Sequence, residues 1–189
     1  DIRKGFFASG GAARPKGTSM LTEDVAAPID RLAEFVIAMR NLLDDHGYED
    51  AIIFGHALAG NLHFQMSDDF SAPGAAEKFD IFSKALSDLV SVQFGGSLKA
   101  EHGTGRAIAP FVEAEWGPKA YGLMHQNKTL FDPENLLNPG VLLNADAKIH
   151  IKNLKVMPLA NELVDMCIEC GFCEPACPSH QMTLSARQR

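Results

Sequence analysis

The sequence predicts an α+β fold, in which a ferredoxin-like split βαβ antiparallel sheet with helices on one face is followed by further helices and a short cysteine-bearing module. Two observations predict the sheet domain. Segments of strand and helix character follow one another in the order strand, helix, strand, strand, helix, strand, and both helical segments repeat apolar residues at steps of three and four. A third observation predicts the module, because all four cysteines lie between Cys167 and Cys177.

The composition of the 189-residue chain is that of an ordinary globular protein, with 46% hydrophobic and 22% charged residues. Its net charge of −7 argues against nucleic acid as a partner. No apolar run approaches the roughly 18 residues that a membrane-spanning helix needs, so no transmembrane segment is expected. Because the first residue is Asp1 rather than Met, we expect a fragment or a processed product.

The first half of the predicted sheet domain starts with an irregular, loop-like segment over residues 1–17, which are rich in glycine and show no periodicity. Residues 18–26 are predicted to form a strand that ends before Pro28, a residue that suits the first turn of a helix. Gly47 is the expected end of this helix. Its apolar face is formed by Leu32, Phe35, Val36, Met39 and Leu43.

Two further strands are predicted over residues 51–56, which read as a buried strand, and residues 61–66, which alternate strictly between apolar and polar. A second amphipathic helix follows and ends at the glycines 95–96. Residues 97–100 are predicted to form a fourth strand, and one or two helices are expected across residues 107–130. The apolar positions of the second helix are Phe79, Phe82, Leu86, Leu89 and Val90.

The C-terminal motif is Cys167-x2-Cys170-x2-Cys173-x3-Cys177-Pro178. Two-residue spacing lets three thiolates wrap around one [4Fe–4S] cluster, and in proteins with two such clusters the fourth cysteine binds the other one. The alternative is a zinc knuckle, but zinc sites usually divide their ligands into two pairs across a longer gap. The motif therefore predicts the start of an iron–sulfur module over residues 161–189, after a linker over residues 145–160. Clustered thiols of this kind indicate a reducing compartment.

A second group of residues with metal-binding chemistry lies around the two middle strands. His56 closes the first of them, and His63 shares the polar face of the second with Asn61. Because a short hairpin brings His56 level with His63, the two imidazoles can converge. Glu101, at the exit of the predicted fourth strand, is the natural third ligand for a first-row divalent metal. The alternative is that each histidine is an ordinary, hydrogen-bonded strand residue.

A third motif, Glu-His-Gly-Thr-Gly over residues 101–105, has glycines that let the backbone approach a ligand closely. His102 within it could act as a general base near neutral pH, although a tight turn with an incidental histidine gives the same pattern. The motif lacks the Lys-Ser/Thr ending of a phosphate-binding loop. Arg3 and Arg14, near the N-terminus, are candidate carboxylate anchors or else solvated surface charges.

Five segments carry a family resemblance: RKG at 3–5, EDVAAP at 23–28, FGHALAGNLHF at 54–64, SLKAEHGTGRA at 97–107 and FDPENLLNPGVLLN at 131–144. In this order they resemble the C-terminal half of the FAD-linked oxidases of the vanillyl-alcohol oxidase superfamily, and most of all its D-lactate, glycolate and D-2-hydroxyglutarate dehydrogenases. Residues 1–144 would then form the substrate domain. The cysteine motif resembles the fused ferredoxin-type module of large bacterial members. Since such proteins also have an N-terminal FAD-binding domain, the resemblance implies that this chain is an excised piece.

The resemblance also implies roles for single residues. His56, His63 and Glu101 match the metal ligands of the family, with zinc or manganese as the ion, and Asn61 would support that site. A further residue, His102, matches the base that accepts the hydroxyl proton of the substrate beside the flavin.

Arg3 matches an arginine that holds the substrate carboxylate in the family. The chain departs from the family pattern at two places. Leu58-Ala59 stand where members often have Gly-Asp, a change that leaves the ligands in place. Thr22 stands near the position of a lysine found in some members, which puts recognition of a second substrate carboxylate in doubt.

The function implied by the resemblance is that of a FAD-dependent dehydrogenase, which oxidises a D-2-hydroxy acid of the D-lactate, glycolate or D-2-hydroxyglutarate class to the 2-oxo acid. Hydride would pass to FAD, and electrons would go on to [4Fe–4S] clusters and a downstream acceptor. The chain alone is expected to be inactive, and the whole protein to be cytoplasmic or peripheral at the inner face of the membrane.

Two alternatives stay open. One is a non-catalytic iron–sulfur subunit that transfers electrons and docks onto a flavoprotein. The other is a superfamily member without net oxidation, such as an ether-lipid synthase, against which the cysteine motif argues because iron–sulfur clusters have no role without electron flow.

Overall fold

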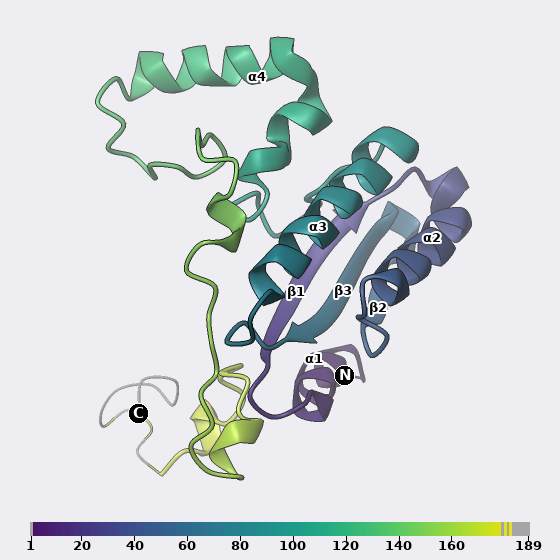
Figure 1. The fold of residues 1–189 in the computed structure, drawn as a ribbon, viewed down its shortest axis with the longest axis vertical. Helices are drawn as coiled ribbons and strands as arrows, with labels where there is room; N and C mark the ends of the chain where they lie inside the picture. Colours follow the sequence, from purple (N-terminus) through teal and green to yellow (C-terminus); the bar gives the residue numbers. More distant parts are fainter. Residues whose placement is uncertain (1, 179, 181, 183–189) are drawn as a thin grey trace.

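A computed structural model describes residues 2–178, 180 and 182 of the chain, with the backbone alone at residues 2–4 and 6–8. Its centre is an antiparallel sheet of three strands in the order β1-β3-β2 (Figure 1). The strands are β1 (Ser19–Ala26), β2 (Ile52–His56) and β3 (Asn61–Asp68). The central strand β3 pairs with both neighbours, so that His63 lies opposite Asp24 on one side and Phe54 on the other.

Two helices cover one face of this sheet, namely α2 (Leu32–Asp45) and α3 (Ala75–Ser87). Their apolar stripes pack on the side chains of β3 that point to the same face, and burial of such side chains is the main favourable term in folding. Both stripes are those predicted from the sequence, and the α+β class is confirmed. The most deeply buried members of this core are Val25, Phe35, Met39, Leu43, Phe64, Phe82, Val90 and Leu98.

The N-terminal segment is a helix, α1 (Ile2–Ala13), so the loop-like start expected over residues 1–17 is wrong for residues 2–13, whereas residues 14–17 form a turn. Its glycines do not break the helix but allow close packing. A Cβ atom on Gly10 would lie 2.6 Å from Oε1 of Gln65, and one on Gly11 would lie 2.4 Å from Cδ1 of Ile168. Tertiary contact thus overrides the low helix propensity of glycine, a cost of about 1 kcal/mol per residue.

The predicted fourth strand over residues 97–100 is also wrong, because it is reduced to one bridge between Ser97 and Ala26. The next backbone N–H groups do not continue a ladder. Glu115 accepts the N–H of Leu98 at 3.2 Å, and Asp24 accepts those of Ala100 and Glu101 at 2.7 Å each. Since side-chain carboxylates take the donors that a strand would need, the segment continues as a loop over the sheet.

The helix α4 (Val112–Phe131) extends away from the sheet (Figure 1). Gly117, with φ 77°, and Pro118 kink it into two parts, which agrees with the expectation of one or two helices across this region. Within residues 2–178, 180 and 182, no helix is both long and apolar enough to pass through a membrane.

A buried histidine holds part of the predicted linker against the sheet domain. His150, in the short turn Ile149–Ile151, is 5% exposed, and its Nε2 atom lies 2.9 Å from Oδ1 of Asp80 on α3. Burial lowers the pKa of His150 more than the Asp80 carboxylate raises it. The imidazole is therefore neutral in the folded protein near pH 7.

The free energy of unfolding should consequently fall in mild acid. In the unfolded chain His150 takes up a proton near pH 6.5, whereas in the folded protein its pKa is lower. The contribution of His150 to the free energy of unfolding is therefore present above pH 6.5 and is lost as the pH falls below it. Denaturant titrations between pH 8 and 5 should show a slope of at most about 1.4 kcal/mol per pH unit from this group. His150→Leu should reduce the slope, whereas His125→Ala, an exposed change on α4, should not. Equal slopes in His150→Leu and the unsubstituted chain would contradict the prediction.

Candidate active site

Three side chains from distant parts of the sequence converge above the face of the sheet opposite α2 and α3. His56 ends β2, His63 lies within β3, and Glu101 belongs to the loop that crosses the sheet. Oε1 of Glu101 lies 2.7 Å from Nε2 of His63 and 3.3 Å from Nε2 of His56. One ligand atom from each residue lies within 4.8 Å of the others. The convergence expected from the sequence is therefore confirmed.

The connection between β2 and β3 brings the two histidines together. A short turn, Ala57–Ala59, ends at Gly60, whose φ of 65° is left-handed. A Cβ atom at this position would lie 2.2 Å from the carbonyl oxygen of Ala27, so that only glycine fits. From there the two-residue period of β3 places His63 on the open face and Phe64 in the core.

The electrostatics of the cluster favour a neutral His63. Its side chain is 9% exposed, and burial lowers its pKa, which the Glu101 carboxylate opposes. Neutral imidazole is the form that binds a divalent ion. The cluster is open on one side, since the side chains of His56 and Glu101 are 38% and 47% exposed. An ion held there would keep a free coordination position, as catalytic zinc sites do.

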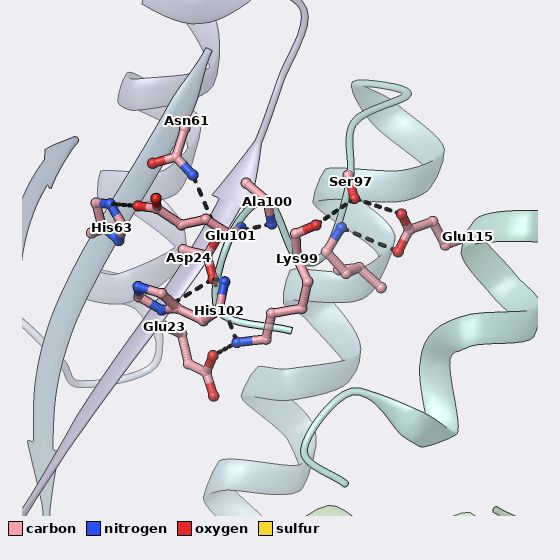
Figure 2. Close-up of polar contacts among 11 residues, drawn as sticks. Glu23, Asp24, Asn61, His63, Ser97, Lys99, Ala100, Glu101, His102 and Glu115 are labelled. Carbon is pink, nitrogen blue, oxygen red and sulfur yellow. Dashed lines mark hydrogen bonds and ion pairs between the residues drawn. The ribbon is translucent and has the colours of Figure 1, made fainter. Parts of the chain in front are cut away.

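A buried carboxylate, Asp24 of β1, organises the loop that carries Glu101 (Figure 2). Asp24 is 0% exposed. Besides the N–H groups of Ala100 and Glu101, it accepts that of His102 at 3.2 Å, and Nδ2 of Asn61 donates to it at 3.3 Å. These hydrogen bonds fix the backbone from which Glu101 and His102 project.

One cation lies beside this carboxylate. Nζ of Lys99 is 3.8 Å from Oδ1 of Asp24 and forms an ion pair with Glu23. Burial lowers the pKa of Lys99 to about 8, so that most of this lysine remains charged at pH 7. Asp24 is thus a buried charge with a nearby counterion, the condition under which buried charges are tolerated.

His102 is oriented by the same carboxylate, with its Nδ1 atom 3.1 Å from Oδ1 of Asp24. An imidazole that keeps its proton on Nδ1 for this contact has Nε2 available as an acceptor. Its ring lies 4.9 Å from that of His63, centroid to centroid, and its side chain is 40% exposed. His102 and the candidate ion site thus lie side by side.

The polar face continues along the sheet beyond the histidines. Thr22 of β1 lies directly opposite Gln65 of β3. Oγ1 of Thr22 and both amide atoms of Gln65 are buried, and no hydrogen-bond partner for them lies among the described residues. Oδ1 of Asn61 is in the same situation, since only its Nδ2 atom is engaged by Asp24. Buried polar atoms of this kind need a partner, which ordered water or a bound group can supply.

Two other predicted sites lie apart from this cluster. Arg3 is in α1, and its side chain is outside the described part of the structure. The four cysteines carry thiols rather than disulfides and lie in a C-terminal segment beside α1 (Figure 1). Among the described residues, only the cluster of His56, His63 and Glu101 brings three metal-type ligands close enough for one ion.

The sequence did not identify the roles of two residues, Asp24 and Arg14. Asp24 stood within a motif, but most of its partners are backbone N–H groups, which leave no signal in the sequence. The one available sign was an acidic residue inside a predicted strand. Arg14, one of two candidate carboxylate anchors, instead donates to five backbone carbonyl groups.

Comparison with known proteins places the chain in a family. The family model described as "FAD linked oxidases, C-terminal domain" matches residues 1–142, so the chain belongs to this family. The match contains the sheet and the cluster of His56, His63 and Glu101, and it ends before the cysteine segment.

Individual relatives carry dehydrogenase and oxidase names. A D-2-hydroxyglutarate dehydrogenase of Pantoea ananatis is 32% identical over 184 residues, covering 85% of this chain and 17% of the relative. The glycolate oxidase subunit GlcD of Bacillus subtilis is 34% identical over 142 residues, covering 72% and 28%. A D-lactate dehydrogenase of Archaeoglobus fulgidus is 36% identical over 117 residues, covering 62% and 25%. The chain therefore spans less than a third of the length of each of these relatives.

Proposed function

We propose that the chain is the substrate-binding part of a flavin-dependent dehydrogenase that oxidises a D-2-hydroxy acid to the 2-oxo acid. The observation that carries the proposal is the pairing of two features. A set of two imidazoles and one carboxylate that suits a divalent ion lies directly beside His102, an imidazole oriented by a buried carboxylate. Membership of the FAD-linked oxidase family and the names of the relatives support the same reaction class.

His56, His63 and Glu101 would hold the ion, zinc or manganese, and Asn61 would support the site through its bond to Asp24. This donor set fits, because two nitrogens and one oxygen plus an open position are typical of catalytic zinc. The ion would polarise the substrate hydroxyl group and bind a carboxylate oxygen.

In the proposed reaction, Nε2 of His102 accepts the hydroxyl proton of the substrate while the C–H bond at the α-carbon breaks. The carbon–oxygen bond becomes a carbonyl, and the two electrons of the C–H bond leave as hydride. FAD would accept this hydride. Arg3 would neutralise the substrate carboxylate, and Asp24 would keep His102 in the tautomer that leaves Nε2 available.

The distal end of the substrate would contact Thr22 and Gln65. Both side chains are neutral, and their buried polar atoms lack partners among the described residues, so they can form hydrogen bonds but do not neutralise a second carboxylate. D-lactate, glycolate and D-2-hydroxyglutarate differ at this end, which makes the pair a determinant of substrate choice.

The cysteine motif would carry electrons away from the flavin. Cys167, Cys170, Cys173 and Cys177 have the spacing of a [4Fe–4S] ligand set, and their thiols suit a cytoplasmic location. We propose residues 1–144 as the substrate domain, 145–160 as a linker and 161–189 as the start of the ferredoxin-type module. FAD would be held mainly by a domain that this chain does not contain.

The proposal predicts that the chain alone, mixed with FAD, does not turn over D-lactate, glycolate or D-2-hydroxyglutarate. The same chain joined to the FAD-binding domain of its full-length protein should bleach the flavin absorbance with at least one of them under anaerobic conditions. Turnover by the chain alone would contradict the assignment of FAD to another domain. A full-length protein that no D-2-hydroxy acid reduces, and that transfers electrons only from a flavoprotein partner, would favour the non-catalytic iron–sulfur subunit.

A further inference from the structure

Arg14, which directly follows α1, joins the two ends of the described chain. Two of its N–H groups are used locally, by the carbonyl oxygens of Gly11 at 3.0 Å and Thr18 at 2.9 Å. The other three bind carbonyl oxygens more than 150 residues away, those of Asp165 at 3.1 Å, Met166 at 3.3 Å and Cys167 at 3.0 Å. All five donors of the guanidinium group are therefore engaged. A solvated surface arginine does not show this pattern.

Residues near Arg14 also contact the segment around Cys167. Ile168 packs directly on the backbone of Gly11, where the Cβ atom of any other residue would lie 2.4 Å from Cδ1 of Ile168. On the other side, Lys155 forms an ion pair with Glu169, and the hydroxyl group of Ser19 donates to the carbonyl oxygen of Lys155. The first turn of the cysteine segment thus rests on α1 and the start of β1 (Figure 1).

This contact places the cysteines close to the substrate sheet. A cavity of about 370 Å³ is lined by Thr22 from β1 and by Cys170 from the cysteine segment, with Arg14 in its wall. Thr22 is two residues from Asp24 on the same face of β1, a separation of about 7 Å along the strand. The sheet that carries the candidate active site and the loop that carries the first thiols therefore border one cavity.

We propose that Arg14 is a positioning residue that docks the cysteine loop onto the substrate domain through its backbone, before any cluster is bound. Because the bonds go to carbonyl groups, the docking does not depend on the cluster. It holds Cys167 and Cys170 beside β1, so that the module receives electrons from a fixed place within the same protein. The positive charge of Arg14 next to Cys167 also favours the more negative, reduced form of a cluster there. The role in electron transfer rests on the proposed function, whereas the docking does not.

Hydrogen exchange of the metal-free 189-residue chain tests the docking. The reporter amides are those of Asp165, which donates to the carbonyl of Asn161, and of Cys167, which donates to that of Val164. Arg14→Leu removes three long-range hydrogen bonds, and their loss should speed exchange at these amides by at least about tenfold. Arg14→Lys, which keeps the charge but has fewer donors, should give an intermediate rate.

The matched control is Arg31→Leu, because Arg31 also donates to a distant carbonyl, that of Gln93 at 2.9 Å, but from the short turn that precedes α2. It should leave the reporter amides unchanged. Unchanged exchange in Arg14→Leu would overturn the docking. If that variant fails to fold, an exchange rate in Arg14→Lys equal to that of the unsubstituted chain would overturn it instead.

A second measurement separates the docking from the proposed function. After incubation of the full-length protein with iron and sulfide under reducing conditions, Arg14→Leu should lower the reduction potential of the cluster that Cys167 binds, and Arg14→Lys should largely restore it because the charge is retained. Equal potentials in all three proteins would contradict the electrostatic part. If the unsubstituted full-length protein binds no iron, the proposed iron–sulfur function fails, while the exchange result still decides the docking.

Discussion

Replacing His63 by alanine will remove the divalent ion from the candidate active site. His63 is the most buried of the three ligands, and its Nε2 atom lies 2.7 Å from Oε1 of Glu101, closer than that of His56. The variant leaves one imidazole and one carboxylate, too few donors for a catalytic zinc site. Loss of a residue that merely orients a ligand typically costs 10–100-fold in metal affinity, so loss of a ligand should cost more than about 100-fold.

Titration with Zn²⁺ and Mn²⁺ in competition with a coloured chelator measures this effect, with all four cysteines replaced by serine in every protein so that their thiols do not bind Zn²⁺. The unsubstituted chain should bind one ion per molecule. His125→Ala is the matched control, since His125 is exposed on α4 and contacts Tyr121 instead of a ligand, and it should bind like the unsubstituted chain. Equal affinity in His63→Ala, or no ion bound by the unsubstituted chain, would contradict the metal site.

The part of the site that the sequence predicted depends on local geometry. His56 and His63 follow from strand period and from a short connection, two features that sequence reports directly. Glu101 lies close to the two histidines because residues 97–101 run beside β1, to which they are joined by a single bridge between Ser97 and Ala26. The position of Glu101 was therefore predicted correctly even though the strand expected there is absent over residues 97–100.

The rest depends on contacts between side chains and backbone that leave no pattern. The carboxylate of Asp24 accepts backbone N–H groups that would otherwise pair in a strand ladder. Arg14 donates to carbonyl groups from both ends of the described chain. In α1 the glycines alone favour a loop, because nothing in the sequence shows that Gln65 and Ile168 occupy the space of their missing side chains. Glycine has the same local signature in a loop and in a tightly packed helix.

Asp24→Asn should weaken both the fold and the site, by separable amounts. The amide keeps the shape of the side chain but replaces one acceptor oxygen with an NH₂ group, which then faces backbone N–H donors. At least one N–H of Ala100, Glu101 or His102 loses its partner, and breaking such a buried charged network should cost about 3 kcal/mol or more of unfolding free energy. Asp45→Asn, at the exposed end of α2, is the matched control and should change stability by less than about 0.5 kcal/mol.

The effect of Asp24→Asn on metal affinity and kcat shows whether Asp24 orients Glu101 and His102 or only stabilises the fold. Glu101 loses its fixed backbone, so the affinity of the folded molecules for Zn²⁺ should fall about 10–100-fold. His102 loses the carboxylate that selects its tautomer, and in serine proteases the equivalent change lowers kcat by about 10⁴-fold. In the full-length protein we therefore expect Asp24→Asn to reduce kcat far more than it raises KM. If the role of Asp24 were purely structural, Asp24→Asn would lower the amount of folded protein, but the molecules that stay folded would keep their ion affinity and their kcat. Unchanged ion affinity and kcat would therefore contradict the role of Asp24 in orienting His102 and Glu101.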